Sequence, residues 1–359
     1  MFDTKLLRAA PSDDEGLFEL RALLYGPGPF VDPAYFQWMY RDGPQGPPAP
    51  SSLWIGRRGS EIVGQSGGFP IALRVARRDV AGFCSLDLGV KPEARGGGLG
   101  ARLMEASLAG REVALALELS PAGREIFRRA AWSDLGTLPL WVLPLDASVL
   151  LPSRLPGSVR RAAGLALNAT FATFRLAASL QRRTRRLHLE SVTRFDERTD
   201  RVFEVSADQY PVLARRDSSF LNWRFARFPG RGRYQLFVAV DGDGLVGHCV
   251  LRIGMKNGFL AGHLVDYFCA PEWTLAMLAR AVAELARQDV KAVYCLHLNP
   301  VSTRPLQALG FLRRDSGWPF MVRTAPPQGE LRDALADRGG WFLTSADGDV
   351  DRPRPGEEC

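Results

Sequence analysis

The chain has 359 residues, 46% hydrophobic and 24% charged, and this composition excludes wholesale disorder because it supplies a sizeable apolar core. Its length predicts about two domains, and no apolar run reaches the roughly 20 residues that a membrane-spanning helix needs. The net charge of +7 rests on 46 basic residues, 42 of them arginine. We attribute this arginine bias to coding composition and therefore expect no nucleic-acid partner. A basic chain nevertheless suits phosphate-bearing ligands.

The first part of the chain alternates strand and helix patterns. A strand over 5–9 precedes a helix whose start is marked by a capping box at Ser12 and Glu15, and a Pro/Gly-rich loop covers 42–52. Period-two patterns then predict strands at 53–58, 61–69, 71–77 and 80–90. The remaining patterns predict a helix at 98–110, a strand at 113–119, a helix at 121–131 and a strand at 137–144. We expect one mixed α/β domain over residues 1–147.

Residues 148–190 differ in composition from what precedes them. They contain eight arginines, and the stretch from 147 to 189 has no acidic residue. Their Ala, Leu and Phe content predicts a basic amphipathic helix that links two domains. Peripheral contact with an anionic membrane surface is an open alternative, because basic helical faces bind such lipids.

The second half of the chain repeats the order of the first. Trp38 aligns with Trp223, and a single offset of 179 residues, without a gap, pairs positions 87–132 with 266–311, including Asp87 with Asp266. Several landmarks in the same order indicate a tandem duplication. We place the second copy at 191–325 and a C-terminal tail, ordered at first and then fraying, at 326–359.

The strongest chemical signal is a glycine-rich turn between a strand and a helix. The strand ends in Val90-Lys91-Pro92, and Arg95-Gly96-Gly97-Gly98-Leu99-Gly100 then opens the helix. Glycines let backbone N–H groups converge on a ligand, and the first helical turn adds unsatisfied donors and a positive dipole end. The segment therefore predicts an anion cradle suited to a pyrophosphate.

These residues resemble the GNAT superfamily of acyl-CoA-dependent N-acyltransferases, whose signature [QR]-x-x-G-x-[GA] follows a strand ending in V-x-P. A weaker landmark, Ile126–Trp132, is similar to the superfamily's lY-x-x-x-G-F helix end. The resemblance covers 5–144 well, and 191–325 by element order and by Leu309-Gly310-Phe311. It implies an α/β (mixed α+β) fold of tandem GNAT-like domains, each a mixed, mostly antiparallel sheet flanked by helices.

The resemblance also implies acetyl-CoA as the acyl donor. The residues expected to bind it are Leu88, Gly89, Val90, Arg95, Gly96, Gly97, Gly98, Leu99, Gly100 and Ala101. Gly89 would ease a strand distortion there. In the second copy the positions that face the cradle, 274–279, contain no glycine. We therefore expect one CoA per chain, in the first domain.

Two carboxylates, Asp87 and Glu118, are the candidate catalytic bases, although each could instead be structural. Asp87 lies on the strand that enters the cradle, and Glu118 ends the next parallel strand, so both could reach the point where the sheet splays apart. Many superfamily members use a tyrosine to protonate the leaving thiolate, and Phe127 occupies that position here. Solvent protonation, a slow reaction or no reaction all remain open.

The sequence thus predicts an N-acetyltransferase for a primary amine on a small molecule, such as an amino sugar or a cell-envelope precursor. An aminoacyl transferase of the tandem class that builds peptide bridges, and a catalytically silent CoA-binding regulatory protein, are the alternatives. None of the five cysteines forms a C-x-x-C pair, and the four histidines lack metal-ligand spacing. We therefore expect no metal site and, without a secretory signal, a cytoplasmic location.

Overall fold

The computed structural model describes residues 4–44, 52–146, 149, 187–230, 232–242, 244–324 and 330–351. The predicted linker at 148–190 lies almost entirely outside the described residues. Within the described ranges, no helix is both long and apolar enough to cross a membrane.

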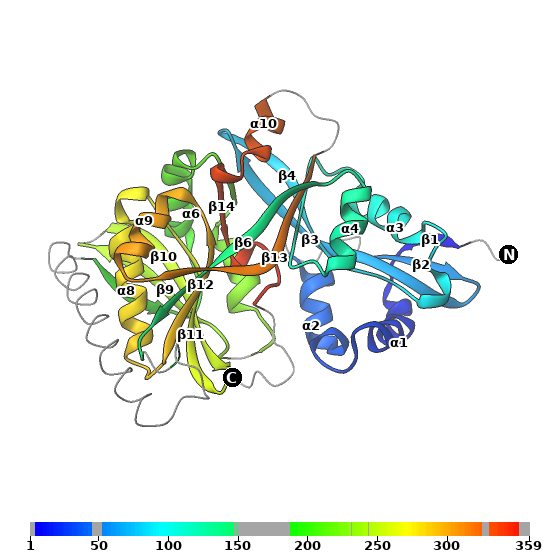
Figure 1. Ribbon diagram of the computed structural model, residues 1–359, viewed down its shortest axis with the longest axis horizontal. Coiled ribbons are helices and arrows are strands. Elements are labelled where there is room, and N and C mark those ends of the chain that lie inside the picture. The colour runs from blue at the N-terminus through cyan, green and yellow to red at the C-terminus, as the bar shows by residue number, and fades with distance from the viewer. Residues whose placement is uncertain are drawn as a thin grey trace.

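The first half contains the elements expected of a mixed α/β fold. In chain order they are β1 (Lys5–Arg8), α1 (Asp14–Tyr25), α2 (Pro33–Gln37), β2 (Trp54–Arg58), β3 (Glu61–Val75), β4 (Arg78–Val90), α3 (Leu99–Leu108), β5 (Val113–Leu117), α4 (Pro121–Arg129) and β6 (Ser133–Pro144). Figure 1 shows this half in blue and cyan.

Two local predictions for this half are wrong. The strands expected at 61–69 and 71–77 are one strand, β3, which continues through Pro70. At Pro70, β3 pairs with β4 on one edge only. On the other edge, the pairing of β3 with β2 ends at Ser66 and its pairing with β8 begins at Leu73, so a proline fits between them. The capping box is also displaced: α1 starts at Asp14, and the Asp13 carboxylate accepts the Ala10 N–H (2.8 Å).

The second half follows the same order of elements apart from one added strand, β8, between its first two helices. They are β7 (His188–Val192), α6 (Glu197–Ser206), β8 (Val212–Ala214), α7 (Ser218–Leu221), β9 (Gln235–Asp241), β10 (Gly244–Lys256), β11 (Phe259–Cys269), α8 (Thr274–Ala286), β12 (Ala292–Leu298), α9 (Pro300–Ala308) and β13 (Leu312–Thr324). Adding 179 to the bounds of α4 gives the bounds of α9. The fold class is the predicted one.

All described strands join one sheet in which the two halves exchange their last strands. The order is β1-β2-β3-β4-β5-β13-β6-β12-β11-β10-β9-β7, so β13 lies beside β5, and β6 lies beside β12. Phe320 of β13 pairs with Leu117, and Tyr294 of β12 pairs with Val142. In Figure 1, β6 and β13 accordingly run through the centre of the molecule. Each half therefore completes the sheet of the other.

A matched pair of tryptophans also joins the halves on one face of this sheet. Trp38 and Trp223 stack with ring centroids 5.0 Å apart and an interplanar angle of 16°. Each indole N–H donates to the backbone carbonyl of the other residue, at 2.7 and 3.0 Å. Both side chains are buried, as are Tyr35 and Phe220. The aromatic landmarks of the repeat are thus core residues.

Part of the predicted C-terminal tail, residues 330–351, is built into the sheet. This segment forms α10 (Glu330–Ala336) and β14 (Trp341–Thr344), and β14 pairs with β12 and β8. Its apolar run is fully buried, and Asp347 forms an ion pair with the buried Arg216 (2.6 Å). Arg224 forms a second buried ion pair with Asp351. Apolar burial and paired charges build the segment into the core.

Candidate functional site

The sheet opens between β4 and β5, and a cavity of about 920 Å³ lies there. These parallel strands pair at only three positions, the last being Cys84 with Leu115, and then diverge. The cavity is lined by the ends of both strands, the start of α3, α4 and the region after α1. We call it the acyl cavity. Cys84, at its base, is fully buried, as expected of a small core residue.

The structure brings together nearly all the residues that the sequence singled out. Those lining the acyl cavity are Asp87, Leu88, Gly89, Val90, Arg95, Gly96, Gly98, Leu99, Gly100, Ala101 and Glu118. Gly97 is not among the lining residues.

The glycine-rich loop presents bare backbone to this cavity. Gly96 and Gly98 have φ angles of 86° and 72°, which strongly favour glycine. A Cβ built on either glycine would meet no atom within 4 Å. The N–H groups in the first turn of a helix have no intrahelical acceptors. At the start of α3 the N-cap is Gly98, which has no side chain to accept from them. The loop and the helix start therefore form an electropositive surface of N–H donors.

Strand β4 is distorted where it lines the cavity, but not at Gly89. Gln65 pairs with Gly89 and Gly67 with Leu86, so Asp87 and Leu88 together oppose one residue in a β-bulge. Asp87 has a φ of 49°. Glycine is needed at 89 for a different reason: a Cβ there would lie 2.5 Å from the Leu24 side chain, so it makes room for the end of α1.

The Asp87 carboxylate is held by two buried side chains. Arg21 Nη2 lies 3.0 Å from Asp87 Oδ2, and the Tyr40 hydroxyl donates a hydrogen bond to the same oxygen. Burial, followed by the charge of Asp87, raises the pKa of Tyr40 well above its usual value, so Tyr40 stays a donor. The matching residue of the second half, Asp266, also pairs with a buried arginine, Arg216 (3.1 Å). This recurrence favours a positioning role for Asp87.

Glu118 follows the last residue of β5 and has a φ of 57°, which turns the chain sharply at the edge of the cavity. The turn continues into α4, whose N-cap Ser120 accepts the Gly123 N–H (3.1 Å). Unlike Asp87, Glu118 lies on a tight connection between two elements. Glu118 and the start of α3 line the same cavity.

Tyr25, Phe30 and Asp349 are among the cavity residues that the sequence analysis missed. Tyr25 and Phe30 stack at 4.5 Å beside Gly89, and Asp349 reaches the cavity from the C-terminal segment. Gln65 Nε2 donates to the Tyr25 hydroxyl (3.4 Å). An aromatic residue just before Gly26-Pro27 was the only available signal for Tyr25. No local pattern connects Asp349 with a loop some 250 residues earlier.

Phe127 forms part of the apolar wall of the acyl cavity. It is buried and contacts Trp132, with ring centroids 4.7 Å apart. A phenyl ring has no proton to donate, so a donor for this cavity must come from another residue or from solvent.

The second half differs at both features that form the acyl cavity. Its helix α8 begins at Thr274, whereas the 179-residue offset would start it at Leu278, so an extra helical turn replaces the glycine loop. Where β11 and β12 diverge, β14 pairs with β12 and places Phe342 against His297 (5.1 Å between ring centroids). The backbone donors are used within the helix, and the gap is filled by side chains.

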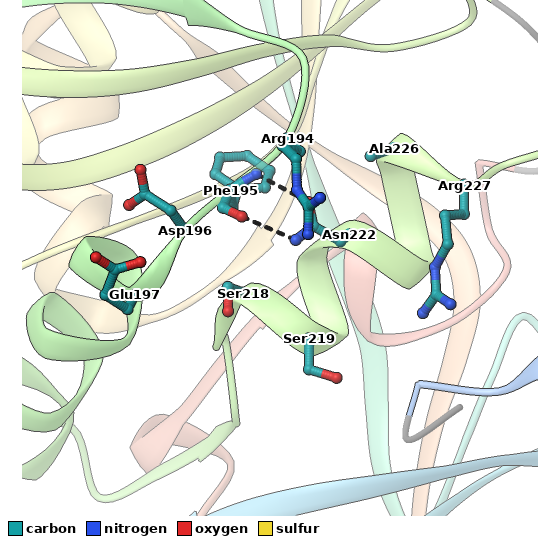
Figure 2. A pocket seen from close by; sticks show the side chains of 9 residues that line it. All are labelled: Arg194, Phe195, Asp196, Glu197, Ser218, Ser219, Asn222, Ala226 and Arg227. Carbon is teal, nitrogen blue, oxygen red and sulfur yellow. Dashed lines mark hydrogen bonds between the residues drawn. The ribbon is translucent and has the colours of Figure 1, made fainter.

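Figure 2 shows another cavity, of about 750 Å³, on the second half. Asn222 spans it, accepting the Phe195 N–H (2.8 Å) and donating to the Phe195 carbonyl (2.9 Å). Asp196 caps α6 by accepting the Arg198 N–H, and it also pairs with the Arg198 guanidinium. Asn222 and Asp196 thus serve the local structure of this region. Across the described parts of the chain, no group of three or more His, Cys, Asp or Glu could hold a metal ion.

No protein-family model and no curated protein sequence matches the chain. It is similar in structure to a GCN5-related N-acetyltransferase from Anabaena variabilis, with a TM-score of 0.61 and 13% identity over 90% of this chain and 73% of that one. For a GCN5-related N-acetyltransferase from Kribbella flavida the TM-score is 0.57, with 16% identity over 97% and 82% of the chains. For an Enterococcus faecalis protein of unknown function, described as a probable N-acyltransferase, the TM-score is 0.57, with 12% identity over 90% of this chain and 73% of that one. The chain shares the fold of these proteins over most of its length.

Proposed function

We propose that this protein is an acyl-CoA-dependent N-acyltransferase that acetylates a primary amine of a small molecule. One observation carries the proposal: a single cavity combines the open N-terminus of α3 with a carboxylate, Glu118, at the point where β4 and β5 diverge. An amino sugar or a cell-envelope precursor fits this reaction class. We further propose a cytoplasmic protein formed by duplication, with units at 1–147 and 191–325 and a possible peripheral membrane contact through 148–190.

The glycine loop would bind the pyrophosphate of acetyl-CoA. The N–H groups of Gly98–Ala101 are the unsatisfied donors of α3, and Arg95 lies beside them with its Nε bonded to the Val90 carbonyl (3.0 Å). Among the described strands, none pairs with β4 on the β5 side beyond Cys84. The backbone of Leu88–Val90 can therefore hold the thioester carbonyl and the pantetheine arm.

The reaction forms a C–N bond, breaks the C–S bond of the thioester, and moves a proton from the amine to a base. We assign that base to Glu118, because it lines the cavity on the turn that follows β5, and we give the Asp87 carboxylate, which is held by Arg21 and Tyr40, a structural role. Asp87 then acts as a positioning residue that fixes the bulge in β4.

Tyr25 is a candidate donor for the proton that the leaving thiolate takes up. It is the one tyrosine among the described lining residues, and its hydroxyl lies beside Gly89, 3.1 Å from a Cβ built there. Gln65 Nε2 donates to the hydroxyl oxygen (3.4 Å), and a phenol carries one proton that it can donate. This arrangement would supply the proton that Phe127 cannot.

A catalytically silent CoA-binding protein is the second candidate. Phe127 in the cavity wall and the engaged carboxylate of Asp87 are the observations that favour it. The aminoacyl transferase alternative receives less support, because a protein that uses aminoacyl-tRNA has no need of a pyrophosphate cradle.

Release of free thiol from acetyl-CoA across a panel of primary amines tests the proposal. The wild-type protein should release thiol with at least one amine, and Glu118→Gln should lower kcat/KM by about 10²- to 10⁴-fold. The affinity of Glu118→Gln for acetyl-CoA, measured by calorimetry, should stay within about twofold of the wild-type value, because the donors of the cradle are backbone N–H groups. Glu105→Gln, on the exposed face of α3 in an ion pair with Arg323, is the matched control. One-to-one CoA binding without thiol release would instead identify the silent protein.

A further inference from the structure

A smaller cavity, of about 310 Å³, lies on the second half of the sheet. Its floor is a row of side chains from three neighbouring strands, in which Arg252 of β10 pairs with His263 of β11, and His263 pairs with Tyr294 of β12. Residues in direct register project from the same face of a sheet, so the three side chains lie side by side. The rest of its polar and aromatic lining consists of Lys256, Ser316, Trp318, Ser345 and Asp351. We call it the anion cavity.

Positive charge dominates this lining. Arg252 and Lys256 are both cationic, and Lys256 Nζ lies 4.9 Å from the centre of the Tyr294 ring. Asp351 is the one carboxylate among the described lining residues; it forms an ion pair with Arg224, and the charge of Arg252 also helps to lower its pKa. Burial and the neighbouring Arg252 and Lys256 hold the pKa of His263 well below its usual value, so the imidazole is neutral.

The polar floor is not required by the fold. The 179-residue offset places Cys84 and Leu115 at the positions of His263 and Tyr294, and both are fully buried apolar residues. The same sheet position is therefore occupied without charge in the first half. The rings of His263 and Tyr294 stack with centroids 5.5 Å apart and an interplanar angle of 24°. Together with Trp318 they give the anion cavity flat aromatic surfaces that suit a compact ligand.

The anion cavity adjoins the acyl cavity. Asp349 lines the acyl cavity, and Val350 and Asp351 line the anion cavity, so the two linings meet within the C-terminal segment. Two residues span at most about 7 Å between Cα atoms. Trp318 also stands two residues from Phe320, which pairs with Leu117 of the acyl cavity. The linings of the two cavities therefore lie close together in the molecule.

We propose that the anion cavity binds a carboxylate or phosphate group of the acceptor, whose amine then reaches the acyl cavity. The substrate class is thus a small amine that also carries an anionic group. This inference rests on the proposed acyltransferase function. Arg252 and Lys256 bind the anion, and the aromatic floor orients the body between the anion and the amine.

Two matched pairs of amines test the inference in acetyl-transfer assays with the full chain. Glucosamine 6-phosphate is compared with glucosamine, and lysine with 1,5-diaminopentane, because the members of each pair differ by the anionic group. The anionic member of at least one pair should have a kcat/KM higher by about tenfold or more, as expected for a charge-assisted contact. The pair that responds distinguishes a phosphate from a carboxylate.

Variants then assign the preference to this cavity. In Lys256→Gln and in Arg252→Gln, the ratio of kcat/KM between the anionic and the neutral member of a responding pair should fall towards one. The affinity for acetyl-CoA should stay unchanged. Arg287→Gln removes the same charge from the exposed side of α8 and should keep the wild-type ratio. Lys256 ends its strand and is only partly buried, so its variant serves as the test if Arg252→Gln does not fold.

Equal kcat/KM for both members of both pairs would overturn the inference and leave the acyltransferase function standing. If no amine is acetylated, the proposed acyltransferase function is rejected, and calorimetry then tests separately whether the anion cavity binds an anionic amine. Binding of glucosamine 6-phosphate or lysine that is lost in Lys256→Gln would support the anion cavity. No binding of either compound, or binding that Lys256→Gln leaves unchanged, would reject it.

Discussion

At the scale of single residues, the glycines of the cradle have different structural roles. Gly98 has a φ of 72°, so a valine there would strain the backbone as well as obstruct a ligand. Gly100 lies in the first turn of α3, and a Cβ built on it would meet only the Val90 side chain, at 3.7 Å. Gly100 is therefore the position at which ligand binding can be changed without backbone strain.

We predict that Gly100→Val lowers the affinity for CoA by at least about tenfold, because its side chain stands among the N–H donors of the helix start. The free energy of unfolding should change by less than about 1 kcal/mol, since glycine is itself unfavourable within a helix. Calorimetry with CoA and denaturant unfolding measure the two quantities. Gly244→Val, at the exposed start of β10, is the control. Wild-type affinity in folded Gly100→Val would exclude the cradle.

The second residue-scale prediction concerns Asp87. Replacement by Asn leaves Arg21 buried without a counter-charge, so Asp87→Asn should lower the free energy of unfolding by about 3–5 kcal/mol. Adding Arg21→Met should restore much of that loss, because both charges are then absent. Urea unfolding of the single and double variants measures this coupling. A stable Asp87→Asn protein with acetyl transfer reduced more than about 100-fold would make Asp87, and not Glu118, the base.

At the scale of elements, β14 determines why the second half has no acyl cavity. It pairs with β12 where the first half leaves β5 open, and His297, which the offset aligns with Glu118, is buried beneath it. Tyr267 and His297 form a hydrogen bond of 3.0 Å there. Burial, together with Arg216, lowers the pKa of His297 to about 3.

This buried histidine predicts acid sensitivity. Between pH 6.5 and about 3 the unfolded chain binds a proton at His297 that the folded protein excludes, so stability falls as the pH drops through that window. The contribution is about 1.4 kcal/mol per pH unit at most. Denaturant unfolding as a function of pH should show a shallower slope for His297→Gln. His188→Gln, at an exposed histidine of β7, should keep the wild-type slope. Equal slopes for all three proteins would contradict this assignment.

At the scale of the whole molecule, strand exchange makes the two halves interdependent. β13 supplies the neighbour of β5, and β6 supplies the neighbour of β12, so separation exposes strand edges in both halves. The buried Trp38–Trp223 stack would also be lost. The acyl cavity lies in the first half but needs the second half for its sheet and for Asp349.

We therefore predict that fragments 1–147 and 187–359 do not fold when expressed separately but form a stable complex when expressed together. Size-exclusion chromatography and near-ultraviolet circular dichroism measure association and tertiary packing. The complex should bind CoA with one-to-one stoichiometry. A folded monomer of either fragment alone would show that the exchanged strands are dispensable.

The sequence by itself determined most of the order of elements, the glycine loop and the cavity-lining residues of β4, of that loop and of the turn after β5. These properties are local: periodicity places strands and helices, and Gly96 and Gly98 report backbone angles that strongly favour glycine. Tertiary structure alone decided the exchange of β6 and β13, because strand pairing between distant segments leaves no local pattern. It also decided which carboxylate is held by Arg21, and that Asp349 reaches the cavity, since both depend on contacts between residues far apart in the chain.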